Sequence, residues 1–510
     1  SAAHAQIVTT RVSITPGGVQ PDSYCIDAAV SADGRVAAFV SLATNLNPAD
    51  TNNKADVYVA DLTSGALSLV SVNSNGEPGD GRSGMPSLSR DGRYVVFHSL
   101  ADNLGAGALP SRSLYLRDRL LGVTELLSVS VSGAPTEGHD GDISSDGRWI
   151  VFESGAADLV ASDTNGRADI FLIDRQAGTT QRVNLGPGGV EAIGGPSRRP
   201  KVSPDGRFIL FESSAINLAT GSVADRADLY LVDRQSGATE RINVSSTGVA
   251  GWGAPRAGAV SADGRFVAFI SSDSDLVDGD ANGVRDVFVR DRVLGQTTLE
   301  TNTHQGWINR GDPDACDLSL DGRTLSFSTT YVLPTPSNSN PPHQVWLKNL
   351  STGFVTCASV NNLNQKGNNR STGASLSEDG TRVVFSSDAT MLVPNDTNSR
   401  SDVFLHELPA VPLPTTFCTA KTNSLGCAPT ITWSGLPSAS AGSGFIIGAQ
   451  QVLPHMSGAL HYGTRGIASP WNGGLQCTAD GNPGRTWPQL ASPSGPPPCT
   501  GEYAYDFNQL

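Results

Sequence analysis

Hydrophobic positions along this chain recur in one pattern, in which two short apolar runs flank an Asp-Gly pair. In SRDGRYVVFHS, residues 89 to 99, the residues after the pair are β-branched and aromatic, as in a strand of a pleated sheet. An Asp-Gly pair between two such runs predicts a tight reversal, because Gly accepts the positive φ that the turn needs. The pattern recurs with its aspartate at Asp33, Asp91, Asp146, Asp205, Asp263, Asp321 and Asp379. The successive spacings are 58, 55, 59, 58, 58 and 58 residues, which indicates a repeat architecture.

Each repeat contains four predicted strands. Strand A precedes the Asp-Gly turn and strand B follows it. Strand C is an apolar run that often begins and ends with Asp, as in DVYVAD from Asp56. A second turn, usually ending in Gly, leads to strand D, for example TQRVNL from Thr180. Four antiparallel strands in each of seven repeats predict an all-β fold, a seven-bladed β-propeller over residues 6 to 407.

The two ends of the repeat region predict how the ring closes. The seventh repeat ends after DVFLHE, residues 402 to 407, and lacks its own strand D. An additional strand D, TTRVSITPGG, stands at residues 9 to 18, before the first repeat. We therefore expect residues 9 to 14 to complete the last blade. An open solenoid, which is the alternative, would leave this strand unpaired.

A charge pattern accompanies the strands. An arginine begins strand B where an aspartate ends strand C, so the two should be cross-strand neighbours that stabilise the blade modestly. The expected pairs are Arg35 with Asp61, Arg93 with Asp118, Arg148 with Asp174, Arg207 with Asp233 and Arg265 with Asp291.

The repeat stops before the end of the chain. Residues 408 to 416 are rich in Pro and predict a stiff linker. For residues 417 to 510 we expect a small β-sandwich-like module held by disulfides, since four of the seven cysteines lie there. Four cysteines allow three pairings, of which one joins Cys418 to Cys427 and Cys477 to Cys499.

The charge, the apolar runs and the cysteines of the chain limit its possible cellular location and its possible partners. The net charge of −14 argues against nucleic acid, because phosphate binding needs a basic surface. No apolar run approaches the roughly 20 residues of a transmembrane helix. Ala3-His4-Ala5 resembles the small-x-small end of a removed secretory signal. Together with the clustered cysteines, this predicts a secreted or extracellular protein, with association to a cell surface left open.

The phrase S-x-D-G-R-x-V-x-F resembles the repeat of TolB-like propellers, a WD40-like family, and SPDGR stands intact at Ser203 to Arg207. The resemblance covers residues 6 to 407 and implies the propeller fold. Such propellers serve as protein-binding platforms, carbohydrate-active enzymes or accessory domains of peptidases, so the resemblance implies little about function. The repeat here is longer than is usual in the family, mainly between strands B and C. The segment FCTAKTNSLGCAPTITWSGLPSASAGSGF is similar to C-terminal modules of secreted bacterial proteins.

No complete catalytic motif is present in the sequence. It contains no G-x-S-x-G elbow, and therefore no nucleophile of the peptidase branch of the family. It contains no His-Glu-x-x-His motif and no paired Cys-x-x-Cys, and its histidines are scattered singly. These observations favour a protein that is not an enzyme.

Four of the loops between strands B and C share the motif Asp-x-Asn-x-x-x-Asp. Calcium takes six to eight oxygen ligands, and alternating Asp and Asn in a tight loop can supply them. The alternative is that these side chains cap turns in the backbone. The predicted calcium ligands are Asp50, Asn52 and Asp56; Asp163, Asn165 and Asp169; Asp280, Asn282 and Asp286; and Asp396, Asn398 and Asp402.

The B–C and D–A loops should share one face of the ring, opposite the A–B and C–D turns. The D–A loops lead into strand A, which lines the central channel, and they carry several arginines. A guanidinium suits the recognition of carboxylate or sulfate, so we expect an acidic glycan or a protein partner at this channel mouth. Solvated loop arginines are the alternative. The predicted ligand-binding residues are Arg82, His139, Arg199, Arg256, Arg310 and Arg370.

The sequence thus favours a secreted, non-catalytic binding or scaffold propeller with calcium-stabilised loops. Two alternatives stay open at this point. One is a carbohydrate-active enzyme, a lyase or hydrolase acting on acidic polysaccharide at the same face. The other is a structural subunit of an extracellular surface assembly.

Overall fold

A computed structural model describes the chain in segments. They are residues 8–105, 112–223, 226–280, 282–301, 308–309, 312–332 and 342–408, followed by 430–434, 446–452, 457–458, 467–471, 474–478, 490–491 and 501–506. The chain divides into two compact units, Ser1–Pro409 and Ala410–Leu510.

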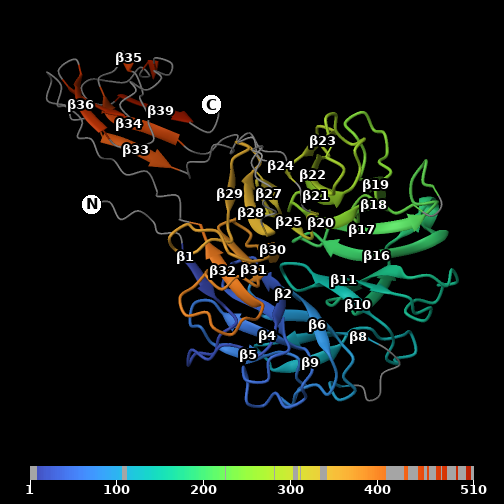
Figure 1. Ribbon diagram of the computed structural model, residues 1–510. Coiled ribbons are helices and arrows are strands. Elements are labelled where there is room, and N and C mark those ends of the chain that lie inside the picture. The colour runs from blue at the N-terminus through green and yellow to red at the C-terminus, as the bar shows by residue number, and fades with distance from the viewer. Residues whose placement is uncertain are drawn as a thin grey trace. The chain divides into compact units, whose positions relative to one another are not determined.

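The first unit contains seven four-stranded antiparallel sheets that follow one another around a ring (Figure 1). Within each sheet the strands lie in the order A, B, C, D, with strand A innermost. The predicted seven-bladed β-propeller is therefore confirmed. The described residues contain no α-helix, and their one helical turn is the 3-10 turn η1, Pro187–Gly189.

Strand bounds follow the repeat closely. Strands A are β2 (Cys25–Val30), β6 (Ser83–Leu88), β10 (His139–Ile143), β16 (Gly194–Val202), β20 (Arg256–Val260), β25 (Cys316–Leu318) and β30 (Ser371–Leu376). Strands B are β3 (Val36–Ser41), β7 (Tyr94–Ser99), β11 (Trp149–Ser154), β17 (Phe208–Ala215), β21 (Phe266–Ser271), β26 (Thr324–Thr329) and β31 (Arg382–Ser387). Strands C are β4 (Asp56–Asp61), β8 (Ser113–Asp118), β12 (Asp169–Asp174), β18 (Asp228–Asp233), β22 (Asp286–Asp291), β28 (Gln344–Asn349) and β32 (Asp402–Glu407). Strands D are β5 (Leu67–Leu69), β9 (Val123–Leu126), β13 (Thr179–Arg182), β19 (Ala238–Arg241), β23 (Gln296–Leu299), β29 (Val355–Cys357) and β1 (Val8–Arg11).

Two small additions lie outside the repeat. The connection from blade 3 to blade 4 contains the hairpin of β14 (Leu185–Gly186) and β15 (Val190–Glu191). Next to blade 6, β24 (Ile308–Asn309) pairs with β27 (Tyr331–Val332).

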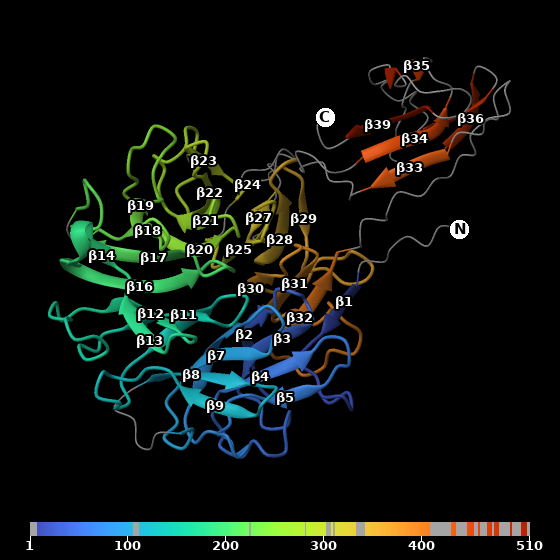
Figure 2. The ribbon, with the colours of Figure 1, turned by 180° about the vertical axis from the view of Figure 1, so that it is seen from behind.

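The ring closes through β1, which is the outer strand of blade 7 (Figure 2). It pairs antiparallel with β32, with Thr9 opposite His406 and Arg11 opposite Phe404. The hydroxyl of Ser13 then donates a 2.8 Å hydrogen bond to Asp402 Oδ1, which is buried. The predicted closure by the N-terminal strand is confirmed.

Strands B and C form the core of each blade, because neighbouring blades cover both of their faces. An aromatic residue in strand B stacks on one in strand C, as Phe39 does on Tyr58 with ring centroids 5.9 Å apart. The same stacking recurs between Phe269 and Phe288 at 5.6 Å. All four side chains are fully buried, so the YVVF-type runs supply the contacts between blades.

Gly in the Asp-Gly pair is required for two reasons. Gly147 has a φ of 72°, which L-residues with a side chain rarely adopt. A Cβ on Gly147 would also overlap the ring of Tyr94 in the preceding blade. Gly206 has a φ of 74° and packs in the same way on Trp149. The repeat is thus fixed by packing between blades as well as by the turn.

The A–B turns also join one another through backbone hydrogen bonds around the channel. Arg90 N donates to Ser145 O at 3.0 Å, and Ser145 N donates to Pro204 O at 2.8 Å. The series continues from Ala262 and ends where Glu378 N donates to Ala32 O at 2.7 Å. Pro204 has no N–H group to donate, so the series is interrupted between blades 4 and 5.

Four of the five expected Arg–Asp pairs are confirmed as ion pairs of 2.7 Å. They are Arg93 with Asp118, Arg148 with Asp174, Arg207 with Asp233, and Arg265 with Asp291. In blade 1, Asp61 instead accepts hydrogen bonds from the backbone of Thr63 and Ser64.

The second unit is described as isolated antiparallel pairings. A three-stranded sheet joins β33 (Thr430–Ser434), β34 (Ile446–Val452) and β39 (Gly501–Asp506). Two further pairs are β35 (Ser457–Gly458) with β38 (Leu490–Ala491), and β36 (Ile467–Trp471) with β37 (Gly474–Thr478). Cys418, Cys427 and Cys499 lie outside the described residues, so the expected disulfides stay a prediction.

Candidate functional site at the loop end of the channel

Strand A is irregular close to the loop face. In a regular strand, successive side chains point to opposite faces of the sheet, and a bulge inserts a residue that changes this alternation. Strand A of blade 3 shifts register between His139 and Asp142, and strand A of blade 4 shifts between Arg198 and Lys201. In five blades the extra residue has a positive φ; these residues are Asp27, Met85, Asp140, Arg199 and Gly373.

At the same level, three consecutive blades carry an ionisable residue in strand B where the other four carry Val, Ile or Ser. From blade 1 to blade 7, the residues at this position are Val40, His98, Glu153, Glu212, Ile270, Ser328 and Ser386. Opposite them in strand A, His139 faces Glu153 and Arg198 faces Glu212. The ionisable residues are therefore gathered on one side of the channel mouth, in blades 2 to 4.

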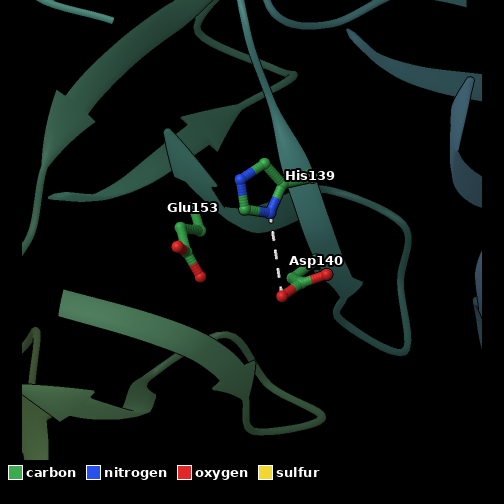
Figure 3. Close-up of side chains that lie close together, drawn as sticks. All are labelled: His139, Asp140 and Glu153. Carbon is green, nitrogen blue, oxygen red and sulfur yellow. Dashed lines mark ion pairs between the residues drawn. The ribbon is translucent and has the colours of Figure 1, made fainter. Parts of the chain in front are cut away.

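In blade 3, the bulge brings His139 and Asp140 together beside Glu153 (Figure 3). His139 Nδ1 lies 3.7 Å from Asp140 Oδ2, and His139 Nε2 lies 3.5 Å from Glu137 Oε1. One ligand atom from each of His139, Asp140 and Glu153 lies within 4.8 Å of the other two. The Asp140 carboxylate raises the pKa of His139, and burial raises the pKa of Glu153. This group could hold a metal ion.

Two exposed arginines of blade 4 lie beside buried carboxylates of blades 3 and 4. Arg199 Nη1 donates to Glu212 Oε2 at 2.8 Å, although the Arg199 side chain is 52% exposed. Arg198 Nε lies 3.7 Å from Glu153 Oε1, and its side chain is 58% exposed. Burial raises the pKa of Glu212, and the charges of Arg199 and Arg256 oppose that rise.

We call the following residues the mouth cluster: His98, His139, Asp140, Glu153, Arg198, Arg199, Glu212 and Arg256. Its members come from strands A and B of blades 2 to 5, and its two guanidinium–carboxylate contacts leave both arginines accessible to a ligand.

The other predicted ligand-binding residues lie apart from this cluster. Arg82 is exposed just before β6, and Arg370 precedes β30, where its Nη2 lies 3.2 Å from Asp314 Oδ2. Arg310 lies outside the described residues. The sequence placed His139, Arg199 and Arg256 in loops, whereas the structure places all three within strand A, because strand A begins earlier than its apolar run.

Below the mouth, strands A carry a second polar group that lines the channel. Asp142 Oδ1 accepts a 2.8 Å hydrogen bond from Ser87 and lies 3.8 Å from Lys201 Nζ. Asp317 accepts hydrogen bonds from the backbone N–H groups of Leu318 and Leu376. Burial raises the pKa of Asp317 to about 6.

The raised pKa of Asp317 predicts a pH dependence of stability. The folded protein takes up a proton on this carboxyl near pH 6, whereas the unfolded chain does so only near its usual value of about 3.9. Stability should therefore fall as the pH rises through 6. We expect Asp317→Asn to reduce the difference in unfolding free energy between pH 5 and pH 7.5, measured by urea denaturation. Parallel pH curves for the two proteins would contradict this assignment.

In the four predicted calcium loops, the Asn side chain forms a turn. Asn52 Nδ2 donates to Asp56 Oδ2 at 2.7 Å, while its Oδ1 accepts from Lys54 N at 2.5 Å. Asn165 makes the same two contacts with Asp169 and Arg167. Asn282 and Asn398 likewise donate to Asp286 and Asp402. The amide oxygen thus faces the backbone, as in the capped turn that the sequence left open.

In two of these loops, a guanidinium lies between the carboxylates. Arg182 Nη1 lies 3.1 Å from Asp163 Oδ1, 3.2 Å from Asp169 Oδ2 and 2.6 Å from Glu191 Oε1. In blade 7, Arg11 lies 2.8 Å from Asp396 and 3.4 Å from Asp402. An arginine of strand D therefore supplies positive charge where the sequence predicts calcium.

Sequence reasoning missed His98, Glu153 and Glu212. Each follows the Phe of strand B, in VVFHS, IVFES and ILFES, where two other repeats have AAFVS and VAFIS. An ionisable residue at a buried position that is Val, Ile or Ser in the other repeats was the available signal. Comparing the seven repeats position by position would have found it.

Two other features lie away from the mouth cluster. A cavity of about 640 Å³ lies at the outer edge of blades 3 and 4, lined by Gln181, Gly188 and Arg234 among others. Its described lining includes Arg182 and Arg234 but no carboxylate, histidine or cysteine, so we place the site at the mouth. Cys25, Cys316 and Cys357 are free thiols, and burial raises the pKa of Cys25 to about 12.

The chain is similar to several solved structures at low sequence identity. No family model and no curated protein matches the chain. Similar solved structures include TolB from Acinetobacter baumannii, with 16% identity, 67% of this chain and 64% of that chain covered, and a TM-score of 0.38. An oligogalacturonate lyase in complex with manganese has 13% identity over 79% of this chain and 93% of that chain, with a TM-score of 0.47. The β-propeller domain of the Trilobed protease from Pyrococcus furiosus has 11% identity over 75% and 95% of the two chains, with a TM-score of 0.45.

These neighbours include TolB-like propellers, in agreement with the resemblance of the repeat. The chain spans less than two thirds of the length of the TolB chain from Acinetobacter baumannii. At these identities and TM-scores the comparisons carry no argument about this chain beyond the likeness itself. Within the described segments, no helix is both long and apolar enough to cross a membrane.

Proposed function

We propose that this chain is a secreted, non-catalytic binding propeller that holds an acidic partner, a glycan or a protein segment, at the mouth cluster. The observation that carries the proposal is the pair of half-exposed arginines, Arg198 and Arg199, set beside buried carboxylates. Secretion is supported by the cysteines beyond residue 417, for which disulfides are part of the proposal.

The cluster suits an anionic partner because its guanidiniums are positioned in advance. Arg199 uses one nitrogen on Glu212, so its remaining N–H donors can bind a carboxylate or sulfate group. Glu212 is 7% exposed, and its contact with Arg199 balances its charge. Arg256, at the start of β20, adds a third guanidinium from the next blade. A site with few mobile parts loses less entropy on binding.

Binding should depend on these arginines and on salt. We expect Arg198→Gln with Arg256→Gln to reduce the affinity for acidic glycans at least 10-fold, because each charged contact contributes about 1.5–3 kcal/mol. Affinity of the unchanged protein should fall between 50 and 300 mM NaCl, since exposed charges are screened. A glycan array with calorimetry on each hit would measure both.

The matched control places the same two substitutions on the opposite face. Arg35→Gln with Arg323→Gln removes equal charge at the A–B turns and should leave binding unchanged. Equal binding by both double variants would contradict the proposed site. Binding only to acidic proteins would narrow the partner class.

A second candidate is a carbohydrate-active enzyme on acidic polysaccharide. The observation that favours it is His139 between Glu137, Asp140 and Glu153, since a lyase needs a base at its anionic substrate. Incubation of the array hits with the protein separates the candidates. New ultraviolet absorbance from an unsaturated sugar, or new reducing ends, would replace the non-catalytic proposal.

Calcium remains part of the proposal for the loops of Asp50 and Asp280. The position in strand D that Arg11 and Arg182 occupy is Leu69 in β5 and Leu299 in β23. In these two blades, strand D therefore supplies no arginine to the loop. A cation that neutralises these loops would stabilise the fold by mass action.

A further inference from the structure

We propose that His139, Asp140 and Glu153 form a binding site for one divalent transition-metal ion, such as Zn²⁺ or Mn²⁺. The site is separate from the four loops in which the sequence predicts calcium, and it does not depend on the proposed binding function.

The backbone supports this site, because it brings adjacent residues of one strand to the same point. His139 and Asp140 are consecutive, and in a regular strand their side chains would lie on opposite faces. The bulge in β10 and the φ of 52° at Asp140 place both beside Glu153 of β11. The same bulge has a positive φ at Asp27, Met85 and Arg199 in blades 1, 2 and 4, so it belongs to the repeat. Blade 3 differs in the side chains that the bulge brings together.

The buried polar groups have few other partners. Glu153 is 5% exposed, and its carboxylate accepts a 3.2 Å hydrogen bond from the backbone N–H of Arg199 at Oε2. Its Oε1 has Arg198 Nε at 3.7 Å, which is beyond hydrogen-bond distance. His139 Nδ1 is buried without a hydrogen bond in the described structure, and it lies 3.7 Å from Asp140 Oδ2. A buried nitrogen without a hydrogen bond is costly unless a ligand binds it, and the Glu153 carboxylate, with one backbone hydrogen bond at 3.2 Å, can bind the same ligand.

The contacts around the proposed ligands are of a type found at metal sites in other proteins. A metal-binding imidazole generally gives its second nitrogen to a carboxylate, which orients the ring. His139 Nε2 lies 3.5 Å from Glu137 Oε1, so Nδ1 is the nitrogen left for the metal. A Nδ1–Oδ2 separation of 3.7 Å fits two bonds of about 2.1 Å to one ion. The third ligand atom, within 4.8 Å, needs a small rotation of a side chain to join them.

The types of ligand atom indicate which metal ion would bind. One imidazole nitrogen and two carboxylate oxygens suit zinc or manganese, whereas calcium prefers oxygen alone and six to eight ligands. Three protein ligands leave at least one coordination position for water or for an oxygen of a bound partner.

Isothermal titration of the apo protein with Zn²⁺ tests the site. We expect one equivalent to bind, and we expect His139→Gln and Glu153→Gln each to weaken binding at least 100-fold. Glu212→Gln is the matched control, because it occupies the same strand position in the next blade and should retain the site. Circular dichroism and melting of each apo variant would establish that it is folded.

A second readout excludes thiols and other histidines. Co²⁺ bound at this site should show visible d–d bands without a sulfur-to-cobalt charge-transfer band, and Asp140→Asn should alter them. Absence of binding at millimolar Zn²⁺, or equal binding by the wild type and Glu153→Gln, would overturn the proposal. Loss of metal binding with unchanged glycan binding would leave the proposed function standing.

Discussion

Deletion of residues 1–15 is expected to destabilise the propeller by more than about 5 kcal/mol, because a whole strand and a buried counter-ion are lost together. The deletion removes β1 and exposes the edge of β32, whose backbone groups then lose their partners. It also removes Arg11 and Ser13, which contact the buried carboxylate of Asp402. An unpaired buried charge costs several kcal/mol by itself. Urea denaturation monitored by circular dichroism would measure the loss.

The control for this truncation is deletion of residues 1–7. It leaves β1 and all the contacts named above in place, so its unfolding free energy should equal that of the whole chain. A synthetic peptide of residues 8–18 should restore stability to the longer deletion in proportion to its concentration, because it binds only the folded ring. Equal stability of the two deletions would contradict closure by β1.

The repeat was sufficient to predict the fold because two independent constraints act on the same residues. Each Asp-Gly pair makes a turn, and its Gly must also admit a side chain of the neighbouring blade, such as the Tyr94 ring at Gly147. A substitution there would damage both, so the phrase is preserved in every repeat. Ring closure was also predictable, because the additional strand D before the first repeat matches the strand D that the seventh repeat lacks.

The site was less predictable because strand A is irregular. Period-two alternation places His139 and Asp140 on opposite faces, and nothing in the local sequence indicates the bulge that brings them together. Asp and Arg at positive φ resemble ordinary strand residues in a sequence. The contribution of strand B could have been found, because Glu153 and Glu212 stand where four other repeats have an uncharged Val, Ile or Ser.

The loop motifs show a further limit of sequence reasoning. Asp-x-Asn-x-x-x-Asp supplies oxygens, and the same oxygens can be neutralised by a guanidinium from another strand. Arg182 and Arg11 come from strand D, which follows the loop in one case and belongs to the opposite end of the chain in the other. Spacing within a loop carries no information about such a partner.

Replacement of Arg182 by Leu is expected to cost about 3–5 kcal/mol, because it leaves buried carboxylates without their counter-ion. The Arg182 side chain is 6% exposed, and those of Asp163 and Asp169 are 2% and 1% exposed. Leu is the appropriate replacement, since Leu69 and Leu299 occupy this position in blades 1 and 5 and the fold accepts their volume. Thermal and urea unfolding would give the loss.

The matched control is Arg241→Leu in blade 4. There Arg226 Nη2 remains 3.0 Å from Asp228 Oδ2 after Arg241 is removed, so the carboxylate keeps a cation and the loss should be smaller. Equal losses for the two variants would show that packing, and not charge, explains the effect.

Two further measurements on Arg182→Leu test whether the loss of charge explains the destabilisation. Lowering the pH from 7.5 to 5 should recover stability, because burial and then Asp169 raise the pKa of Asp163 to about 6 even beside Arg182. The folded form therefore takes up a proton that the unfolded chain binds only at lower pH, and stability rises as the pH falls through 6. Millimolar calcium should also recover stability, since Asp163, Asp169 and Glu191 then face one point without the guanidinium. Recovery by neither proton nor calcium would refute the role of Arg182 as the cation of this loop.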